Sequence, residues 1–456
     1  MNATTGLGFE TCGNATIIAY DRDVPVLVTD PWIRGAQYFG SWTLPYRYTS
    51  EQLEAFSKAR HVWFSHGHPD HLNQDSLALL RDKVLLLSEH QGRRIYADLR
   101  RMGFDVHEVP SCRWVRLSDR VRICTAPDWN QDSAILIAFG DACGVLDLND
   151  GGALGTRAFF RRELRRFRRR FVLALIHYGD ADMMNFVAES GERLVPFSFE
   201  RKPLGFEYSA LLRRWGATHT APFSCHHAYA RTDSLWAAEH ETPLADHGVG
   251  FDGRRGELIP GNFAYDVAAD RVTVTPMGRG PREVRPPEDF GDSWSEPLEP
   301  DDVVCLRSYF GKFEHLRRSF EFVNFRVAGR DHTVSLGGPK GRGITFEAPR
   351  ASLMKAVQHE VFDDLLIGNF MRTTLHGGVK SLYPDFSPYV AKYGDNGRAF
   401  SEAELRAYFR AYRQVAGLHA FIDGMRTRSA LTLRNVLASS PTAYRAARRA
   451  YGYLKR

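Results

Sequence analysis

Three histidines and one aspartate crowd into the short segment SHGHPDH, residues 65–71. Imidazole and carboxylate groups are common protein ligands of zinc, iron and related metal ions. His66 and His68 are two residues apart, so both side chains can turn toward one ion. Asp70 and His71 are displaced enough along the chain to reach a second ion. The spacing therefore predicts a metal site that holds one or two ions.

A strand before this segment and a helix after it are expected to hold the ligands in place. The apolar run HVWFS (61–65) predicts a short buried strand, and NQDSLALLRD (73–82) predicts a helix. Strand patterns such as VPVLVTDPW (24–32) and FVLALIHYG (171–179) recur further along, and the basic run over 157–170 predicts another helix. This alternation predicts an α/β fold in which helices cover sheets.

The length and composition fit a globular protein of two domains. The chain has 456 residues, of which 43% are hydrophobic and 25% charged. The stretch 276–300 is rich in Pro, Gly and charge and is the best candidate for a linker. It would separate a catalytic domain over 1–275 from a smaller domain over 301–456. The strand patterns followed by helical patterns in this second part predict an α+β unit that caps the active site or supports a homodimer.

The charge, apolar content and cysteine usage of the chain limit the partners and the compartment that we expect for it. The net charge is +6, and much of the excess lies in RRELRRFRRR (161–170) and in the last residues of the chain. Such runs are usually solvated helix faces, and no nucleic-acid motif accompanies them, so we expect no nucleic-acid partner. No apolar stretch of 18 residues and no signal peptide is found, which predicts no membrane span. Six scattered cysteines without a C-x-x-C pair favour a reducing cytoplasm.

The pattern H-x-H-x-D-H after an apolar strand resembles the signature of the metallo-β-lactamase superfamily. The resemblance spans most of the predicted first domain and implies an αββα sandwich. It implies that Asp30 orients a metal ligand through a hydrogen bond and that Asp150 is a carboxylate bridging two ions. The segment GATHTAPFSCHHAY resembles the late strand that ends in the last histidine ligand. His226 and His227 are the candidates for that ligand, and we prefer His227.

One ligand that the superfamily usually supplies is absent. A further histidine is expected between the cluster and the bridging aspartate, but the corresponding segment reads TAPDWNQDSAIL. Asp128, Asn130 or Asp132 could replace it with an oxygen ligand, or His177 could reach in from its strand. Because carboxylate is a harder ligand than imidazole, such a site would shift preference from zinc toward iron or manganese. The metal is therefore open between zinc, iron and manganese.

Three further segments are similar to the CMP-N-acetylneuraminate hydroxylase-like group, and more distantly to the ascorbate-6-phosphate lactonase-like group. They are FETCGNATIIAY (9–20), HAYARTDS (227–234) and FDDLLIGNF (362–370). The hydroxylase carries a Rieske iron–sulfur domain, whose cluster needs a C-x-H and a C-x-x-H pair. This sequence has no C-x-x-H pair. The resemblance is therefore to a relative without a Rieske domain.

These residues and the resemblance leave three functions open. The first is a metal-dependent hydrolase, in which metal-activated water attacks an ester, lactone, amide or phosphodiester of a small anionic substrate, nucleotide- or sugar-linked. Asp70 or Asp150 would act on the water, and Arg231 would hold the anionic group. The second is an O2-dependent oxygenase with one or two non-haem irons and a separate reductase. The third is a non-catalytic, metal-stabilised binding protein.

Overall fold

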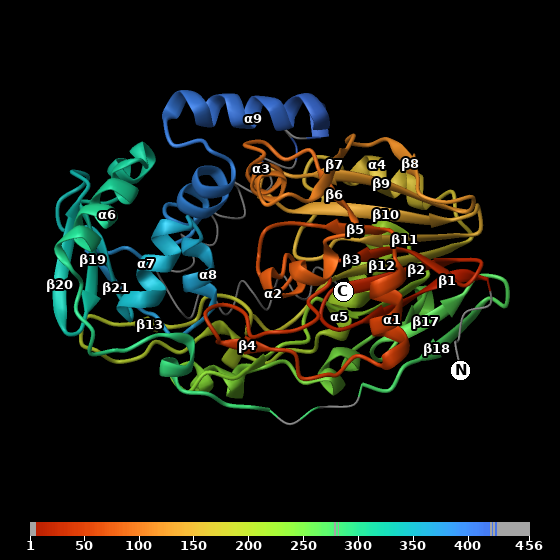
Figure 1. Ribbon diagram of the computed structural model, residues 1–456, viewed down its shortest axis with the longest axis horizontal. Coiled ribbons are helices and arrows are strands. Elements are labelled where there is room, and N and C mark those ends of the chain that lie inside the picture. Colours follow the sequence, from red (N-terminus) through yellow and green to blue (C-terminus); the bar gives the residue numbers. More distant parts are fainter. Residues whose placement is uncertain (1–5, 278–279, 281, 420–421, 423–424, 426–456) are drawn as a thin grey trace.

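The described part of the chain is built around three β-sheets of eight, seven and five strands. The computed structural model describes residues 6–277, 280, 282–419, 422 and 425. Two large sheets lie face to face in one half of the molecule, and the third sheet lies in the other half (Figure 1).

The first large sheet contains the strand that leads into the histidine segment. Its order is β18-β17-β1-β2-β3-β5-β6-β7, and the neighbours from β3 to β7 run parallel. Its strands are β1 (Leu7–Cys12), β2 (Thr16–Asp21), β3 (Val24–Thr29), β5 (His61–Phe64), β6 (Val84–Ser88), β7 (Asp105–Val109), β17 (Phe263–Asp266) and β18 (Arg271–Val274).

The second large sheet carries the later part of the same half. Its order is β16-β14-β12-β11-β10-β9-β8, with β11, β12, β14 and β16 parallel. Its strands are β8 (Trp114–Arg116), β9 (Val121–Pro127), β10 (Ser133–Phe139), β11 (Cys143–Asp147), β12 (Arg169–Leu175), β14 (His219–Phe223) and β16 (Glu257–Leu258).

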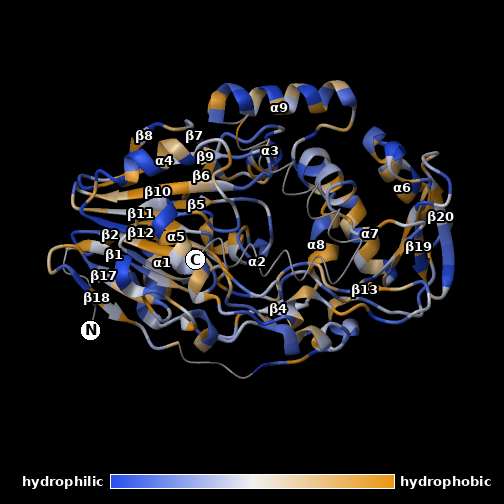
Figure 2. Ribbon diagram, turned by 180° about the vertical axis from the view of Figure 1, so that it is seen from behind, coloured by the Kyte–Doolittle hydropathy of each residue, from blue (hydrophilic) through white to orange (hydrophobic). Residues whose placement is uncertain are grey.

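Helices cover the outer faces of these two sheets. The main apolar core, with Phe9, Ile137 and Phe171 fully buried, fills the space between the sheets. Figure 2 shows the apolar character of these central strands. The helices are α1 (Ser50–Lys58), α2 (Gln74–Leu77) and α3 (Arg94–Arg101) on the first sheet, and α4 (Arg157–Leu164) and α5 (Gly205–Trp215) on the second. The predicted αββα sandwich is confirmed.

The remaining half has its own sheet and its own apolar core. The sheet order is β13-β22-β21-β19-β20, with strands β13 (Phe186–Val187), β19 (Phe322–Val327), β20 (Arg330–Ser335), β21 (Gly343–Glu347) and β22 (Arg372–His376). The edge strand β13 comes from the earlier part of the chain. Phe310, Phe325 and Phe346 lie in this core together with residues of α6 (Pro300–Gly311), α7 (Arg350–Gln358) and α8 (Phe362–Ile367). This half is the predicted α+β unit, while the boundary at 276–300 stays a prediction.

Helix α9 (Glu402–Ala416) lies across the top of both halves in Figure 1. A π-helix over Pro388–Asn396 precedes it and lies beside α8. A two-stranded pair of β4 (Trp42–Thr43) and β15 (Ala228–Tyr229) completes the fold near the junction of the two halves. The predicted helix over 157–170 ends at Leu164, because Arg169 and Arg170 already belong to β12. The basic end of the chain lies outside the described residues.

In the part of the chain that the structure describes, no helix is both long enough and apolar enough to cross a bilayer.

Candidate metal centre

The segments with predicted ligands meet at one edge of the sandwich because each follows the carboxyl end of a strand. Asp30 follows β3, the histidine segment follows β5, Asp150 follows β11, and the segment with His227 follows β14. β3 and β5 are parallel in the first sheet, and β11, β12 and β14 are parallel in the second. Parallel strands end at the same edge of a sheet, so residues far apart in the sequence come together.

The histidine segment is fixed at both ends. Ser65 N donates to Asp30 Oδ1 at 2.8 Å directly after β5. The segment then turns, with His71 N donating to the His68 carbonyl at 3.0 Å. Asn73 caps the following helix α2 by accepting from Ser76 N at 2.7 Å. The strand before and the capped helix after therefore hold the ligand side chains on a rigid frame.

Three of the predicted ligands form a cluster at this edge. The ligand atoms of His66, His71 and Asp150 all lie within 4.8 Å of one another. His71 Nε2 is 3.5 Å from Asp150 Oδ1, and His66 Nε2 is 3.8 Å from Asp150 Oδ2. Ser224 Oγ donates to Asp150 Oδ1 at 2.7 Å and fixes the carboxylate. Two imidazole nitrogens and one carboxylate thus converge on one point.

Asp30 supports His71 from behind. Asp30 is fully buried, and its Oδ2 is 3.1 Å from His71 Nδ1. Asn149 Nδ2 donates to the same Oδ2 at 2.7 Å. A carboxylate on Nδ1 leaves Nε2 as the nitrogen that faces Asp150, and such support orients a metal-binding imidazole.

His68 lies beside the cluster with both of its ring nitrogens engaged. Its Nδ1 is 2.8 Å from His66 Nε2, and its Nε2 is 3.0 Å from Asp363 Oδ2. Burial lowers the pKa of His68, but the hydrogen bond and charge of Asp363 outweigh it and raise that pKa to about 9. The pKa of His66, by contrast, is held well below its usual range by burial and by its histidine neighbours.

Asp70 is held by hydrogen bonds rather than lying free. Tyr38 Oη donates to Asp70 Oδ1 at 2.5 Å, and Asn14 Nδ2 donates to Oδ2 at 2.9 Å. Asp70 Oδ2 lies 3.5 Å from His71 Nε2. Burial raises the pKa of this carboxyl. Asp70 therefore borders the cluster on the His71 side.

The two histidines of the late strand differ in their contacts. His226 N donates to Asn14 Oδ1 at 2.9 Å, and its ring Nε2 is 3.4 Å from the Pro222 carbonyl. His227 stacks on Trp42 with ring centroids 3.7 Å apart. Both ring nitrogens of His227 are buried without a hydrogen-bond partner, and Asp180 Oδ2 lies 3.9 Å from Nε2. Burial lowers the pKa of His227 to about 4, so it is neutral near pH 7, the form that binds metal.

The residues proposed to replace the absent histidine lie around the cluster. Asp128 and Asp132 sit in the turn between β9 and β10. Burial raises the pKa of both carboxyls, that of Asp128 to about 7, and the charge of Lys392 in the π-helix opposes this shift. His177 Nδ1 lies 3.1 Å from Asp180 Oδ1. Within the described residues, none of these joins the group formed by His66, His71 and Asp150.

Arg231, predicted to hold a substrate anion, is committed elsewhere. Its side chain is fully buried, with Nε 2.8 Å from Asp233 Oδ1 and Nη2 2.7 Å from Asp292 Oδ2. Its Nη1 donates to the Phe39 carbonyl at 2.8 Å. In this structure Arg231 ties the segment around Asp292 to the sandwich and is not open to a substrate.

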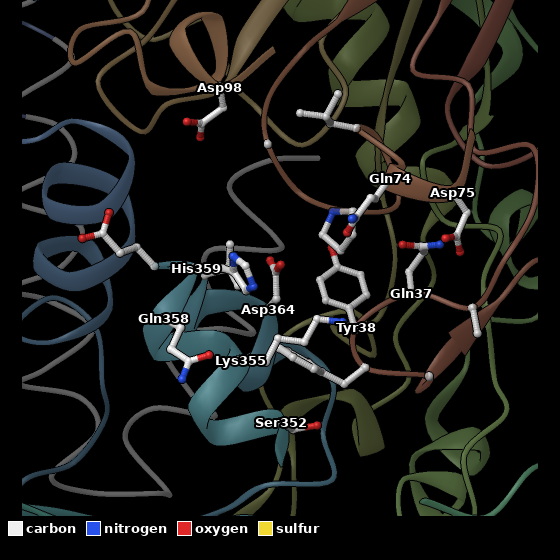
Figure 3. Close-up of a pocket in the computed structure, with 18 of the residues that line it drawn as sticks. Gln37, Tyr38, Gln74, Asp75, Asp98, Ser352, Lys355, Gln358, His359 and Asp364 are labelled. Carbon is white, nitrogen blue, oxygen red and sulfur yellow. The ribbon is translucent and has the colours of Figure 1, made fainter. Parts of the chain in front are cut away.

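A large pocket opens between the sandwich and the α7–α8 region. Its volume is about 910 Å³, and Gly67, Tyr38 and Lys355 are among the residues lining it. Figure 3 shows Tyr38, Lys355 and Asp364 turned into this space. It shares Gly67 and Asp364 with a smaller pocket of about 240 Å³ that reaches His68. Polar side chains from both halves of the molecule therefore border a space next to the histidine segment.

Several residues around the centre were missed in the sequence. They are Asn14, Tyr38, Asn149, Ser224, Asp363 and Asp364. The acidic pair in FDDLLIGNF was visible as part of a family-like segment, but nothing in its spacing links it to a histidine 295 residues earlier. Asn14 lies in the family-like segment FETCGNATIIAY and Ser224 in GATHTAPFSCHHAY, but nothing in either segment marks these two side chains as contacts of the centre.

The αββα sandwich, with its histidine segment at the end of β5, has the layers that the resemblance to the metallo-β-lactamase superfamily implied. Three solved structures are similar to the chain. The metallo-β-lactamase fold protein YhfI from Bacillus subtilis is 12% identical over 46% of this chain and 78% of its own, with a TM-score of 0.27. Isothiocyanate hydrolase from Delia radicum gut bacteria is 12% identical over 59% and 99%, with a TM-score of 0.37. CmlA, a diiron β-hydroxylase from Streptomyces venezuelae, is 17% identical over 49% and 45%, with a TM-score of 0.33.

Two curated proteins are similar in sequence, and both are cytidine monophosphate-N-acetylneuraminic acid hydroxylases. The protein from Sus scrofa is 25% identical over 122 residues, and that from Asterias rubens is 34% identical over 128 residues. The matches cover 25% and 27% of this chain, but only 28% and 19% of the relatives' length. No family model matches the chain. The resemblance to the hydroxylase group is confirmed, and the similar solved structures include a hydrolase and a diiron hydroxylase.

Proposed function

We propose that this protein is a non-haem iron hydroxylase that uses O2 to oxidise a small polar substrate. The observation that carries the proposal is the cluster of His66, His71 and Asp150. Two histidines and one carboxylate around an open position are the donor set of non-haem iron oxygenases. The two curated relatives, both hydroxylases, support the same chemistry.

The residues present fit a metal ion. Two nitrogens that bind one ion at about 2.1 Å stand roughly 3 to 3.5 Å apart. The separation of 2.8 Å between His66 Nε2 and His68 Nδ1 is close to that value. The buried ring nitrogens of His227 lack hydrogen-bond partners and are open to a bound group, but His227 lies outside the cluster of His66, His71 and Asp150. Asp30 would fix the orientation of the His71 ring, and Ser224 would fix that of the Asp150 carboxylate.

Iron bound at this site would supply the activation of O2. The overall reaction converts a substrate C–H bond, O2, two electrons and two protons into a C–OH group and water. The electrons would come from a separate reductase. The task of this chain is to position the substrate in the pocket of about 910 Å³, where Lys355 can hold an anionic group. Tyr38 lines this pocket and donates a hydrogen bond to Asp70, whose carboxylate lies 3.5 Å from His71 Nε2.

A metal-dependent hydrolase is the second candidate, because catalytic zinc also binds two histidines and a carboxylate. Zinc would supply a water deprotonated near neutral pH. The observation that favours hydrolysis is Asp70, whose carboxylate lies 3.5 Å from His71 Nε2 at the edge of the cluster. In that reaction Asp70 would orient the water or take its proton.

Metal analysis and two activity assays separate the candidates. The chain is loaded anaerobically with Fe2+ or with Zn2+, and its visible spectrum is recorded before and after air. We expect colour to develop in the iron form and O2 uptake with a chemical reductant, both reduced at least tenfold in His71→Ala. Colourless, zinc-loaded protein that cleaves phosphodiesters or lactones and leaves O2 untouched would reject the hydroxylase and favour the hydrolase.

A further inference from the structure

His68 receives its support from the other half of the molecule. Its Nε2 is 3.0 Å from Asp363 Oδ2, across 295 residues of sequence. Both side chains are about four-fifths buried, with exposures of 20% and 19%. A contact of this kind is not an exposed ion pair that solvent would weaken.

Asp363 is held in place by the packing of α8. Phe362 and Leu365, which flank the two aspartates, are fully buried in the apolar core of this half. Asp363 and Asp364 instead line the smaller pocket that reaches His68. Arg94 of α3 donates through Nη1 to the Glu360 carbonyl at 2.6 Å and so ties the start of α8 to the sandwich. The carboxylate is therefore fixed against His68 by a core on one side and a side-chain bridge on the other.

This hydrogen bond determines which nitrogen of His68 faces the centre. A carboxylate on Nε2 keeps the proton on that nitrogen, which leaves Nδ1 to bind a metal. Nδ1 lies 2.8 Å from His66 Nε2, one of the three clustered ligands. The imidazole thus turns Nδ1 toward the same nitrogen by which His66 faces Asp150.

We propose that Asp363 is a positioning residue of the metal centre, through which α8 orients His68 to bind the ion beside His66. The inference rests on the proposed function in one respect only, that a metal ion binds at the cluster. It gives α8 a role in building the centre, in addition to lining the pocket.

Asp301 of α6 is the control in the same half of the molecule. Its side chain is exposed on the first turn of that helix. Asp301→Asn therefore removes an acidic group from the same half without touching His68 or either pocket.

The test is Co2+ binding to the full chain, followed by calorimetry and by visible absorption. We expect Asp363→Ala and the similarly shaped Asp363→Asn to weaken Co2+ affinity about 10- to 100-fold and to alter the absorption bands. Asp363→Glu should recover part of the affinity, and Asp301→Asn should stay within about threefold of the original protein. Circular dichroism checks that each variant is folded.

Two results would overturn different parts of the proposal. Unchanged affinity and unchanged absorption in both Asp363→Ala and Asp363→Asn would overturn the role of Asp363 while leaving the metal centre intact. Failure of the original protein to bind Co2+ would reject the metal centre itself, and with it the proposed function.

Discussion

Asp150 is the residue through which the second sheet contributes to the metal site. The Asp150 carboxylate lies 3.5 Å from His71 Nε2 and 3.8 Å from His66 Nε2. The two histidines follow β5 of the first sheet, whereas Asp150 follows β11 of the second sheet. Replacing it with asparagine keeps the volume and removes the negative charge. We expect Asp150→Asn to weaken Fe2+ affinity at least tenfold and to lower activity at least 100-fold, because the only clustered carboxylate among the described residues is lost.

The control for this prediction is Asp141→Asn, which removes a highly exposed carboxylate at the far end of β11's hairpin. It should leave both measurements unchanged. Equal Fe2+ affinity in Asp150→Asn and in the original protein, measured by anaerobic calorimetry, would mean that the cluster is not the binding site.

Asp395 makes stability depend on pH in the second half. Burial raises the pKa of this carboxyl to about 8, although Tyr309 Oη donates to it at 2.6 Å. The unfolded chain has an aspartate pKa near 3.9. The folded protein therefore holds a proton that the unfolded chain releases. This contribution to stability is complete below about pH 4 and is lost progressively as the pH rises from there through about 8.

Asp395→Asn should remove that dependence. We expect the variant to be more stable than the original protein at pH 9, by on the order of a few kcal/mol, and much closer to it at pH 5. Denaturant unfolding at pH 5, 7 and 9 in metal-free buffer measures the difference. Parallel stability curves for the two proteins would show that Asp395 is ionised at neutral pH.

Among single residues, the sequence predicted the ligand types better than their grouping. The fixed offsets of SHGHPDH predicted His66 and His71 among the ligands and the family resemblance implied Asp150, and the structure brings these three side chains together. The pairing of His66 with His68 and of Asp70 with His71 rested on spacing alone. In the structure His71 turns toward Asp150 because Asp30 holds its other nitrogen, a contact across 41 residues that spacing does not encode.

Helix α9 fastens the turn between β9 and β10. Tyr408 Oη donates to the Trp129 carbonyl at 2.7 Å and accepts from Gln131 Nε2 at 2.9 Å. This turn carries Asp128 and Asp132, which border the metal centre. Helix α9 therefore holds the turn with the candidate ligands Asp128 and Asp132 through a hydrogen bond to the backbone of that turn.

Tyr408→Phe should cost about 1 to 3 kcal/mol of stability, because two buried hydrogen bonds are lost. Val415→Ala, on the same helix with 45% of the side chain exposed, should change stability by less than about 0.5 kcal/mol. Urea unfolding provides the comparison. If the two variants lose the same stability, α9 does not depend on the Tyr408 contacts.

Elements with a strong local pattern were predictable, and elements defined by tertiary contacts were not. The strand HVWF and the start of a helix after the histidine segment follow from apolar runs, although the helix predicted over 73–82 is α-helical only over Gln74–Leu77. The basic run over 157–170 predicted one helix, but Phe167 packs into the core under α4 and the chain has already entered β12 by Arg169. Side-chain charge alone could not place that boundary.

Metal binding should stabilise the whole molecule, since its ligands come from both sheets and its supports from both halves. A ligand that binds only the folded state at about 1,000 times its Kd adds roughly 4 kcal/mol. We expect Fe2+ or Co2+ to raise the midpoint of thermal unfolding in a concentration-dependent way. His66→Ala should lack that shift. The same shift in His66→Ala as in the original protein would indicate binding elsewhere.

The arrangement of the two halves was the least predictable feature. The αββα layers follow from alternating patterns and from family-like motifs, so they could be predicted from the sequence. The contact between His68 and Asp363 spans 295 residues, and the edge strand β13 joins a sheet formed mainly after residue 320. No local pattern specifies such long-range pairings, because they depend on how one packed unit docks on another.

Whether the clustered histidines hold a metal ion is decided by anaerobic Fe2+ binding, measured by calorimetry in the original chain and in His71→Ala. We predict one or two ions bound by the original protein and an affinity at least tenfold weaker in the variant. Equal binding by the two proteins, or no binding by the original chain, would contradict the metal centre.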